Sequence, residues 1–285
     1  EDPLMISFAV LVAGFLFKWL AKPLKKSVTT MSRVMSTRIF LAIVVIVLGL
    51  ISSVITAIIA ALMLVAIVSV LRLDRRTELL VVIMACYSIG MGATLTPIGE
   101  PLSTITISKL NESFFYLFNL LGIYVIPGVV LFGVLTAIMV KPMESDSSLT
   151  AEKTKETYMD IVIRALKIYL FVMALTFLGE GFEPLINMYI VDLSPNLLYW
   201  INMISAVLDN ATLAAAEVSP AMSKDTIKAI LLGLLISGGM LIPGNIPNII
   251  AAGKLKITSK EWAYLGIPIG LITMVVYFIM IIVIP

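Results

Sequence analysis

The sequence predicts an all-α polytopic membrane protein made of two inverted-topology repeats, and three observations lead to this prediction. The chain is 60% hydrophobic and only 13% charged, with a mean hydropathy of +1.08. It contains several uncharged runs long enough to cross a bilayer, since a helix needs about 20 residues to span a core ~30 Å thick. Polar, Gly and Pro residues interrupt hydrophobic segments at corresponding places in the two halves.

The interruptions form two matched pairs of motifs. The first half carries Ile-Ser-Ser-Val-Ile-Thr at 51–56 and Thr-Pro-Ile-Gly-Glu-Pro at 96–101. The second half carries Ile-Ser-Ala-Val-Leu-Asp-Asn at 204–210 and Ile-Pro-Gly-Asn-Ile-Pro at 242–247. The alignment of the halves pairs Ser52 with Ser205, Thr56 with Asp209, Pro97 with Pro243 and Pro101 with Pro247. Such matched breaks are typical of the binding site of a secondary transporter.

Charge and length predict a re-entrant hairpin over 38–72. No charged residue lies between Arg38 and Arg72. A straight helix of that length would be about 50 Å long, well beyond the ~30 Å of a bilayer core. Both flanks are basic, and basic flanks favour the cytoplasm. We therefore expect the segment to enter and leave on one side, with its tip near 52–56.

The same reasoning divides the whole chain. The first repeat, 1–142, continues with a broken helix at 77–110 and a helix at 113–140, and a hydrophilic cytoplasmic linker follows at 143–157. The second repeat, 158–285, begins from the opposite side and contains a hairpin at 184–222, a broken helix at 224–253 and a last helix at 262–284. We expect the protein in the plasma membrane. In this topology three of the 20 Lys and Arg residues, Lys109, Lys224 and Lys228, lie near the outer side and the others at or near the cytoplasmic side, as the positive-inside rule requires.

The tips and breaks supply the candidate ligands. Non-helical backbone at membrane depth is tolerated where protein buries it or where it lines a wet cavity. It frees carbonyl groups for a cation and N–H groups for an anion. The candidate ion- or substrate-binding residues are Ser52, Ser53, Thr56, Thr96, Gly99, Glu100, Ser205, Asp209, Asn210, Gly244, Asn245 and Asn248.

Asp209, Asn210 and Glu100 are the candidate ligands for Na⁺. A carboxylate inside the membrane is costly and is functional by default. It can bind a proton and a cation in turn. The alternative is that Asp209 or Asn210 caps the helix that begins near 211, which is compatible with ion binding. Glu100 is equally explained as an acid at a helix N-terminus, where the helix dipole favours it.

Composition excludes several other functions. The chain has no His and one Cys, which rules out a His/Cys zinc site, a Ser-His nucleophile and an internal disulfide. It has no phosphate-binding loop of the Gly-x-x-x-x-Gly-Lys type. The basic residues lie between spans, so we expect no nucleic-acid partner. We expect no enzyme and no resident cofactor; an aspartyl enzyme using Asp209 and Glu100 would need Tyr-Asp and Gly-x-Gly-Asp motifs, which are absent.

Three other features predict structural roles. Gly266-x-x-x-Gly270 suits a close contact between helices. Trp262 suits an anchor at the membrane interface. Glu217 is expected at the outer end of the second hairpin, outside the central site.

The motifs at 205–210 and 244–248 resemble those of the ion transporter superfamily, which includes NhaD-type sodium/proton antiporters, ArsB-type arsenite permeases and divalent-anion/sodium symporters. The motif at 96–101 resembles the first-half motif of a compact branch of that group. The resemblance implies two helix-hairpin repeats, a homodimer, and ion binding by Asp209 and Asn210. This chain departs from the antiporters in having Ala211-Thr212 where many have Pro.

Two functions follow as expectations. The first is secondary transport of a small inorganic ion across the lipid bilayer, as Na⁺/H⁺ antiport by alternating access, with Na⁺ and H⁺ as the transported species. The alternative is a sodium-coupled symporter of a small anion or carboxylate, held by hydroxyl groups and helix N-termini.

Overall fold

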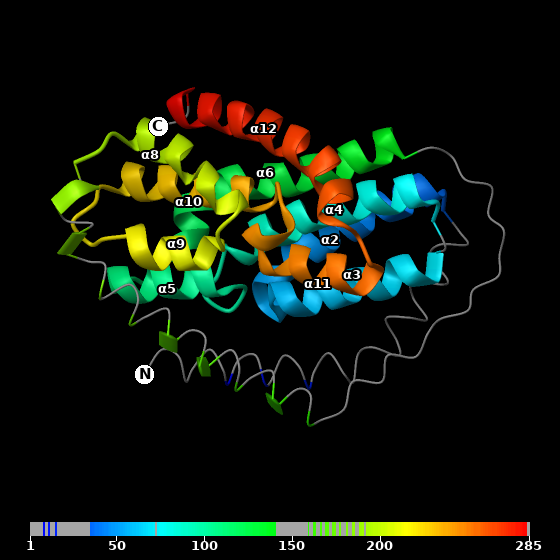
Figure 1. Ribbon diagram of the computed structural model, residues 1–285, viewed down its shortest axis with the longest axis horizontal. Coiled ribbons are helices and arrows are strands. Elements are labelled where there is room, and N and C mark those ends of the chain that lie inside the picture. Colours follow the sequence, from blue (N-terminus) through cyan, green and yellow to red (C-terminus); the bar gives the residue numbers. More distant parts are fainter. Residues whose placement is uncertain are drawn as a thin grey trace.

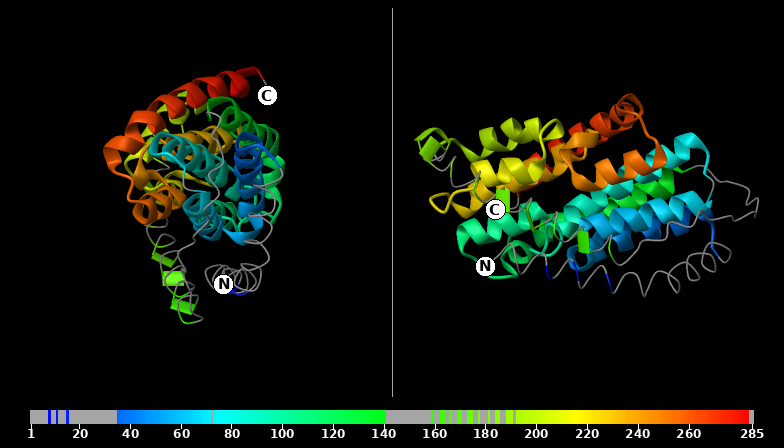
Figure 2. Two further views of the ribbon diagram at one scale, coloured as in Figure 1. Left: turned by 90° about the vertical axis from the view of Figure 1, so that its right-hand side faces the viewer. Right: turned by 60° about the horizontal axis from the view of Figure 1, so that its bottom comes forward.

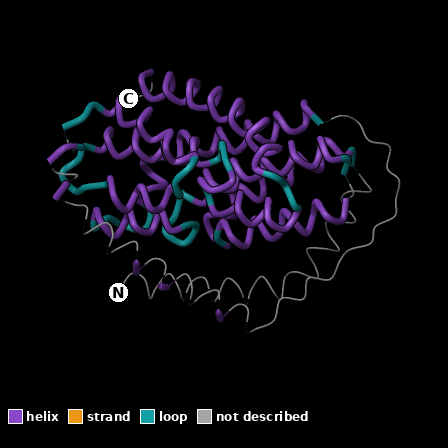
Figure 3. The backbone as a smooth tube through the Cα atoms, viewed as in Figure 1, coloured by secondary structure: helices purple, strands orange, loops and turns teal. Residues whose placement is uncertain are grey.

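The computed structural model describes residues 35–71, 73–140 and 192–283, together with scattered positions at 8–15 and 159–190. All regular elements in these parts are helices (Figure 3). Four helices are long and apolar enough to cross a membrane: α2 (Thr37–Ile55), α4 (Arg75–Ala93), α6 (Tyr116–Met139) and α12 (Ser259–Val283). The prediction of an all-α membrane protein is confirmed. The linker at 143–157 lies outside the described residues.

Helix α2 is followed by α3 (Ala57–Leu71), and one residue, Thr56, joins them. The two helices pack side by side, and their junction lies near the middle of the long axis of the molecule (Figure 1). Thr56 ends α2 by donating its N–H to the Ser52 carbonyl (3.0 Å). It begins α3 by accepting the N–H of Ile59 on its side-chain oxygen (3.3 Å). The two helices together cover the segment predicted as a hairpin, 38–72, and its entry and exit on one side of the membrane stays a prediction.

Both predicted broken helices are present. Helix α4 is followed by turns at 94–100 and then by α5 (Pro101–Leu110). Helix α10 (Lys224–Gly238) is followed by the 3-10 turn η2 (Ile242–Gly244) and α11 (Ile246–Leu255). The pair α4–α5 runs along the long axis in one direction and the pair α10–α11 in the other (Figure 1). Proline occupies the first turn of α5 and α11, where its missing N–H costs no helical hydrogen bond.

The second hairpin is built from shorter pieces. Its first arm contains α8 (Pro195–Ile201) and the 3-10 helix η1 (Asn202–Ala206), and its second arm is α9 (Asn210–Glu217). The tip at 207–209 lies between them. Both arms pack against α10 (Figure 2). The structure describes this hairpin continuously from residue 192 onward, so much of its first arm lies outside the described residues.

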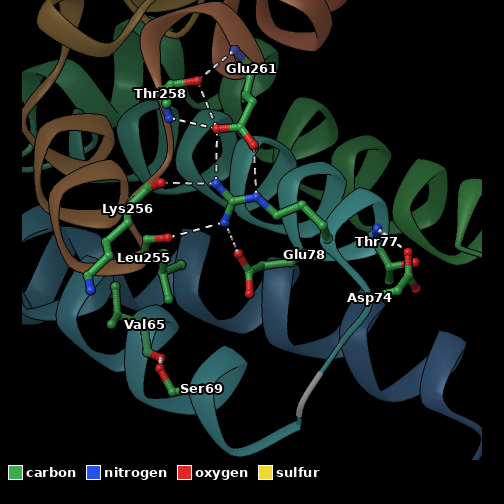
Figure 4. A network of polar contacts seen from close by, with 10 residues as sticks. Val65, Ser69, Asp74, Thr77, Glu78, Leu255, Lys256, Thr258 and Glu261 are labelled. Carbon is green, nitrogen blue, oxygen red and sulfur yellow. Dashed lines mark hydrogen bonds and ion pairs between the residues drawn. The ribbon is translucent and has the colours of Figure 1, made fainter.

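A polar network at one end of the molecule ties three helices together (Figure 4). The Arg75 guanidinium, at the start of α4, donates to both carboxylate oxygens of Glu261 on α12 (2.9 Å each). It also donates to the carbonyl oxygens of Leu255 (3.2 Å) and Lys256 (3.0 Å), where α11 ends. Arginine suits this task because its planar fork can satisfy several acceptors at once. The network fixes the far end of the second broken helix to the first.

Close packing at the core depends on glycine. A Cβ atom at Gly92 of α4 would overlap the Gly49 carbonyl group of α2. Gly122 of α6 is also buried in a helix, but a Cβ there would meet only the end of Ile126, at 3.9 Å. The backbones of α2 and α4 therefore approach each other more closely than any larger residue at 92 allows.

We predict that Gly92→Ala lowers stability by about 1–3 kcal/mol, because overpacking forces two backbones apart. Gly122→Ala should be neutral or stabilising by up to about 1 kcal/mol, since alanine is the better helix former. The measurement is the thermal midpoint of the detergent-purified protein for both variants beside wild type. Equal midpoints for the two variants would contradict the close approach of α2 and α4.

Candidate central ion site

The first break is bonded to the first hairpin tip. The N–H of Ala57, the first residue of α3, donates to the Gly99 carbonyl oxygen (2.8 Å). The Thr96 hydroxyl donates to the carbonyl oxygen of Ser53 near the end of α2. These bonds satisfy backbone groups that the helix ends leave without intrahelical partners. The predicted association of the residues at 52–56 with those at 96–101 is present in the structure.

The second break is closed by its own helix, by the second tip and by α12. The Asn248 side-chain amide donates to the carbonyl oxygens of Gly238 and Leu241 (2.9 Å each). Gly244 lies against the carbonyl oxygen of Ser205, at the tip, without room for a Cβ atom. The Trp262 indole donates to the Gly239 carbonyl oxygen (3.1 Å) and is fully buried. The prediction of Trp262 as an interfacial anchor is therefore wrong.

Equivalent hydrogen bonds occur in the two tips. The Ser52 hydroxyl shares its hydrogen between the carbonyl oxygens of Gly49 in its own helix (2.6 Å) and of Ile89 in α4 (3.0 Å). The Ser205 hydroxyl donates to the Leu234 carbonyl oxygen of α10 (3.2 Å). Asp209 caps α9 through the N–H of Thr212 (3.0 Å), just as Thr56 caps α3. These contacts agree with the alignment of Ser52 with Ser205 and of Thr56 with Asp209.

The two breaks correspond residue by residue, but their alignment is shifted by one residue from the one predicted from their prolines. Glu100 and Asn245 both precede the first residue of a helix and share an extended backbone, with φ −156° and −152°. Asn111 and Lys256 end those helices with the same left-handed dihedrals, φ 52° and ψ 43°. Glu100 is therefore the positional counterpart of Asn245, and Pro101 pairs with Ile246 rather than Pro247.

Helices from the two halves of the chain pack against each other at the centre. Helix α5 packs against α9, and α11 packs against α3. The first contact brings the residue at the start of α5, Glu100, close to the second tip. The Asn210 side chain lies next to the Glu100 carboxylate, and the charge of Asp209 acts on it. The structure thus brings all three predicted Na⁺ ligands together.

Glu100 is the more deeply buried of the two acids. It is 5% exposed, and its Oε1 accepts a hydrogen bond from the Thr94 hydroxyl (2.6 Å). It makes no capping bond to α5, although it stands at the capping position. Among the described residues, no Lys or Arg forms an ion pair with Glu100 or Asp209. Two acids thus share a largely dry region without a cationic side chain bound to them.

Asp209 is partly buried and has a structural task. Its Oδ2 accepts hydrogen bonds from the N–H (3.0 Å) and the hydroxyl (3.2 Å) of Thr212. The capping interpretation is therefore confirmed. Ion binding by Asp209 stays a prediction and is compatible with the cap, because Oδ1 takes no part in these bonds.

Two buried amide oxygens at the second break lack hydrogen-bond partners among the described residues. These are Oδ1 of Asn245 and Oδ1 of Asn248. The Asn245 side chain rests against Gly90 of α4, where a Cβ atom would collide with it. Buried unpaired acceptors are uncommon and require a partner such as a cation or water. Across the described residues, no three His, Cys, Asp or Glu side chains gather as metal ligands, so carbonyl and amide oxygens would have to complete a site.

The serine candidates use their hydroxyl groups in hydrogen bonds to helix carbonyls. The Ser53 hydroxyl donates to the Leu50 carbonyl oxygen (2.8 Å) within α2. The hydroxyl hydrogens of Ser52 and Ser205 are used by helix carbonyls, as described above. Ser52 and Ser205 therefore tie the tips to α4 and α10, whereas the Ser53 hydroxyl bonds only within α2.

The candidate residues chosen from the sequence did not include a hydroxyl group that holds Glu100, or a buried acid outside the central site. Thr94, which holds Glu100, precedes the predicted break motif. Glu217 was expected at an outer hairpin end, yet it is 8% exposed and lies beside Asn202. Lys228 is also buried, but it pairs with Asp225 (3.1 Å) and lies over the Tyr124 ring, away from the tips. The signal that could have identified Glu217 is an acid inside a largely apolar stretch.

We predict that Ser52→Ala and Ser205→Ala each lower stability by about 1 kcal/mol, the usual net value of one hydrogen bond. Ser53→Ala is the matched control, because its hydroxyl bonds only the preceding turn of its own helix. The thermal midpoints of the three purified variants test this. A loss in Ser53→Ala as large as in the other two would contradict the role of the tip-to-helix bonds.

Comparison with known proteins gives one finding on the family. The chain belongs to the family described as "Protein of unknown function (DUF1646)", whose family model matches residues 1–284. A search of curated proteins finds no match.

Proposed function

We propose that this membrane protein is a secondary ion transporter, and that it exchanges Na⁺ for H⁺ at the centre of the molecule. One observation carries the proposal: Glu100 and Asp209, from opposite halves of the chain, act on each other in a region where no described Lys or Arg pairs with them. Buried acids within membrane proteins mark ion and proton pathways.

The physical argument is one of charge compensation. Two ionised carboxylates close together in a region of low dielectric repel each other, and each loses its hydration. Either a proton or a bound cation removes this cost. Because both neutralise the same oxygens, they compete for the site. Competition between H⁺ and Na⁺ at one site that opens to each side in turn is antiport.

The neighbouring oxygens suit Na⁺ better than a soft metal. Hard cations favour carboxylate, carbonyl and amide oxygens. The carboxylates of Glu100 and Asp209 are accompanied by the buried Asn210 side chain, and the unpaired amide oxygen of Asn245 belongs to the corresponding break. We propose Asp209, Asn210 and Glu100 as the primary ligands.

Alternating access would arise from two inverted repeats. The opposite directions of α4–α5 and α10–α11 support this topology, as do the equivalent hydrogen bonds of Ser52 and Ser205. Inverted repeats with broken helices at the midplane are a recurrent design of secondary transporters. The resemblance to NhaD-type antiporters, the plasma-membrane location and the homodimer belong to the same proposal.

We predict that Asp209→Asn abolishes cation-triggered proton flux while leaving the fold intact. Asparagine caps a helix as well as aspartate does, so the variant removes the charge and keeps the cap. Asp209→Ala should lose both, with about 1 kcal/mol of stability. The measurement is the internal pH of proteoliposomes after external Na⁺ or Li⁺ is added.

Glu112→Gln is the control for this experiment, since Glu112 is an exposed acid just beyond the end of α5. It should exchange at the wild-type rate. Wild-type flux in Asp209→Asn would contradict the assignment of the central site. Absence of flux in wild type with every alkali cation would contradict antiport itself.

Sodium-coupled uptake of a small anion is the second candidate. The N-termini of α3, α5, α9 and α11 all begin at the tips and breaks. Helix N-termini carry partial positive charge and free N–H groups, which favour an anion. Under this function, Na⁺ should stimulate uptake of a labelled carboxylate into proteoliposomes without any accompanying proton counterflow. Uptake that does not depend on Na⁺ would exclude it.

A further inference from the structure

A second buried acid lies away from the central site. Glu217 is the last residue of α9 and is 8% exposed. Its Oε2 has no hydrogen-bond partner among the described residues, and none of the ion pairs there includes it. A buried carboxylate oxygen without a partner costs free energy. Burial of this carboxylate therefore requires a partner for its Oε2 atom.

Asn202 is the polar side chain beside it. Asn202 begins η1, is completely buried, and lies next to the Glu217 carboxylate. Neither Oδ1 nor Nδ2 of Asn202 makes a hydrogen bond of normal geometry. Its backbone is held, because the Ser237 hydroxyl donates to the Asn202 carbonyl oxygen (2.7 Å), and it packs closely on α10, where a Cβ atom at Gly233 would lie 3.2 Å from the Asn202 Cβ. An immobile amide and a carboxylate therefore face each other with unused ligand atoms.

The position on α9 favours a cation. Glu217 follows Asp209 by eight residues, about 12 Å along a helix, so the two acids do not share one site. The C-terminal end of a helix carries partial negative charge. The Lys109 ammonium already donates to the Ala215 carbonyl oxygen in the last turn of α9 (2.8 Å). This end of α9 thus already attracts one positive charge, and the Glu217 carboxylate is a further negative group there, beside Asn202.

We propose that Glu217 and Asn202 form a second binding site for an alkali cation, on the side of the central site toward which α9 runs. The carboxylate of Glu217 and the amide oxygen of Asn202 are the ligands. This inference deepens the proposed ion transport and rests on it. A second site at this place would hold a cation on its way between the centre and the end of the molecule.

A bound water together with a proton on Glu217 is the simpler occupant, because a protonated carboxyl carries no charge and can donate to the Asn202 amide oxygen. The two occupants differ in one measurable property: only a cation site gives a component of Na⁺ binding that depends on Glu217. An anion is disfavoured by the carboxylate and by the negative partial charge of the helix end.

The experiment measures ²²Na⁺ binding to the purified full-length protein in detergent by scintillation proximity. Glu217→Gln keeps the shape of the side chain and removes the charge, and Asn202→Ala removes the amide. Each should weaken one component of Na⁺ binding by about tenfold or more, as expected for loss of a contact to a charge. Glu112→Gln is the matched control and should bind Na⁺ as wild type does. Asp209→Asn should retain the Glu217 component.

Protein thermal stability in NaCl and in choline chloride gives a second readout, because a ligand that binds only the folded protein raises its stability. The stabilisation by Na⁺ should be smaller in Glu217→Gln and absent in the double variant with Asp209→Asn. Wild-type binding and stabilisation in Glu217→Gln would overturn the second site, leaving the central site standing if Asp209→Asn still loses exchange. If Glu217→Gln loses its component of Na⁺ binding while Asp209→Asn still exchanges ions at the wild-type rate, the central site is overturned instead.

Discussion

The backbone groups freed at the breaks must find partners inside the protein, and the rest of the structure depends on how they do so. Lipid offers no hydrogen bonds, so exposed N–H and carbonyl groups at that depth would each cost several kcal/mol. The first hairpin tip supplies partners to the first break, through Ala57 and Thr96. The second break relies on Asn248 and Trp262. The first hairpin is therefore required by the first break, whereas the second break is closed by α11 and α12.

The same requirement makes the central site a product of both halves. A break bonded to its tip cannot move far from it, so the helix that begins at the break is fixed in direction. Helix α5 consequently lies on α9 and α11 lies on α3. This exchange of contacts places Glu100, from the first half, beside Asn210, from the second. A site shared in this way changes whenever one half moves relative to the other, as transport by alternating access requires.

Sequence alone predicted the features that follow from backbone physics. Uncharged length predicted the hairpin at 38–72, and Gly-Pro spacing predicted both breaks, because Pro and bilayer thickness constrain the chain locally. Gly266 and Gly270, predicted to make a close contact between helices, pack closely on Met240, which lies in the second break rather than in a helix. The burial of Trp262 and Glu217, and the one-residue register of the breaks, depend on which helix covers which face. No local pattern carries that information, and equally spaced prolines suggested a different register.

The two ends of α9 show why its two acids require different treatment. At the start of the helix, the positive partial charge of the N-terminus stabilises the Asp209 carboxylate. Asp209 needs a further positive charge only because a second acid, Glu100, lies near it. At its end, Glu217 lies at the negative partial charge of the helix C-terminus, where the Lys109 ammonium donates to the Ala215 carbonyl oxygen. A capped acid is stable in its ionised form, whereas a buried acid at the C-terminal end calls for an additional positive charge. The sequence retains an acid at both ends, and a mobile cation is a single species that satisfies each.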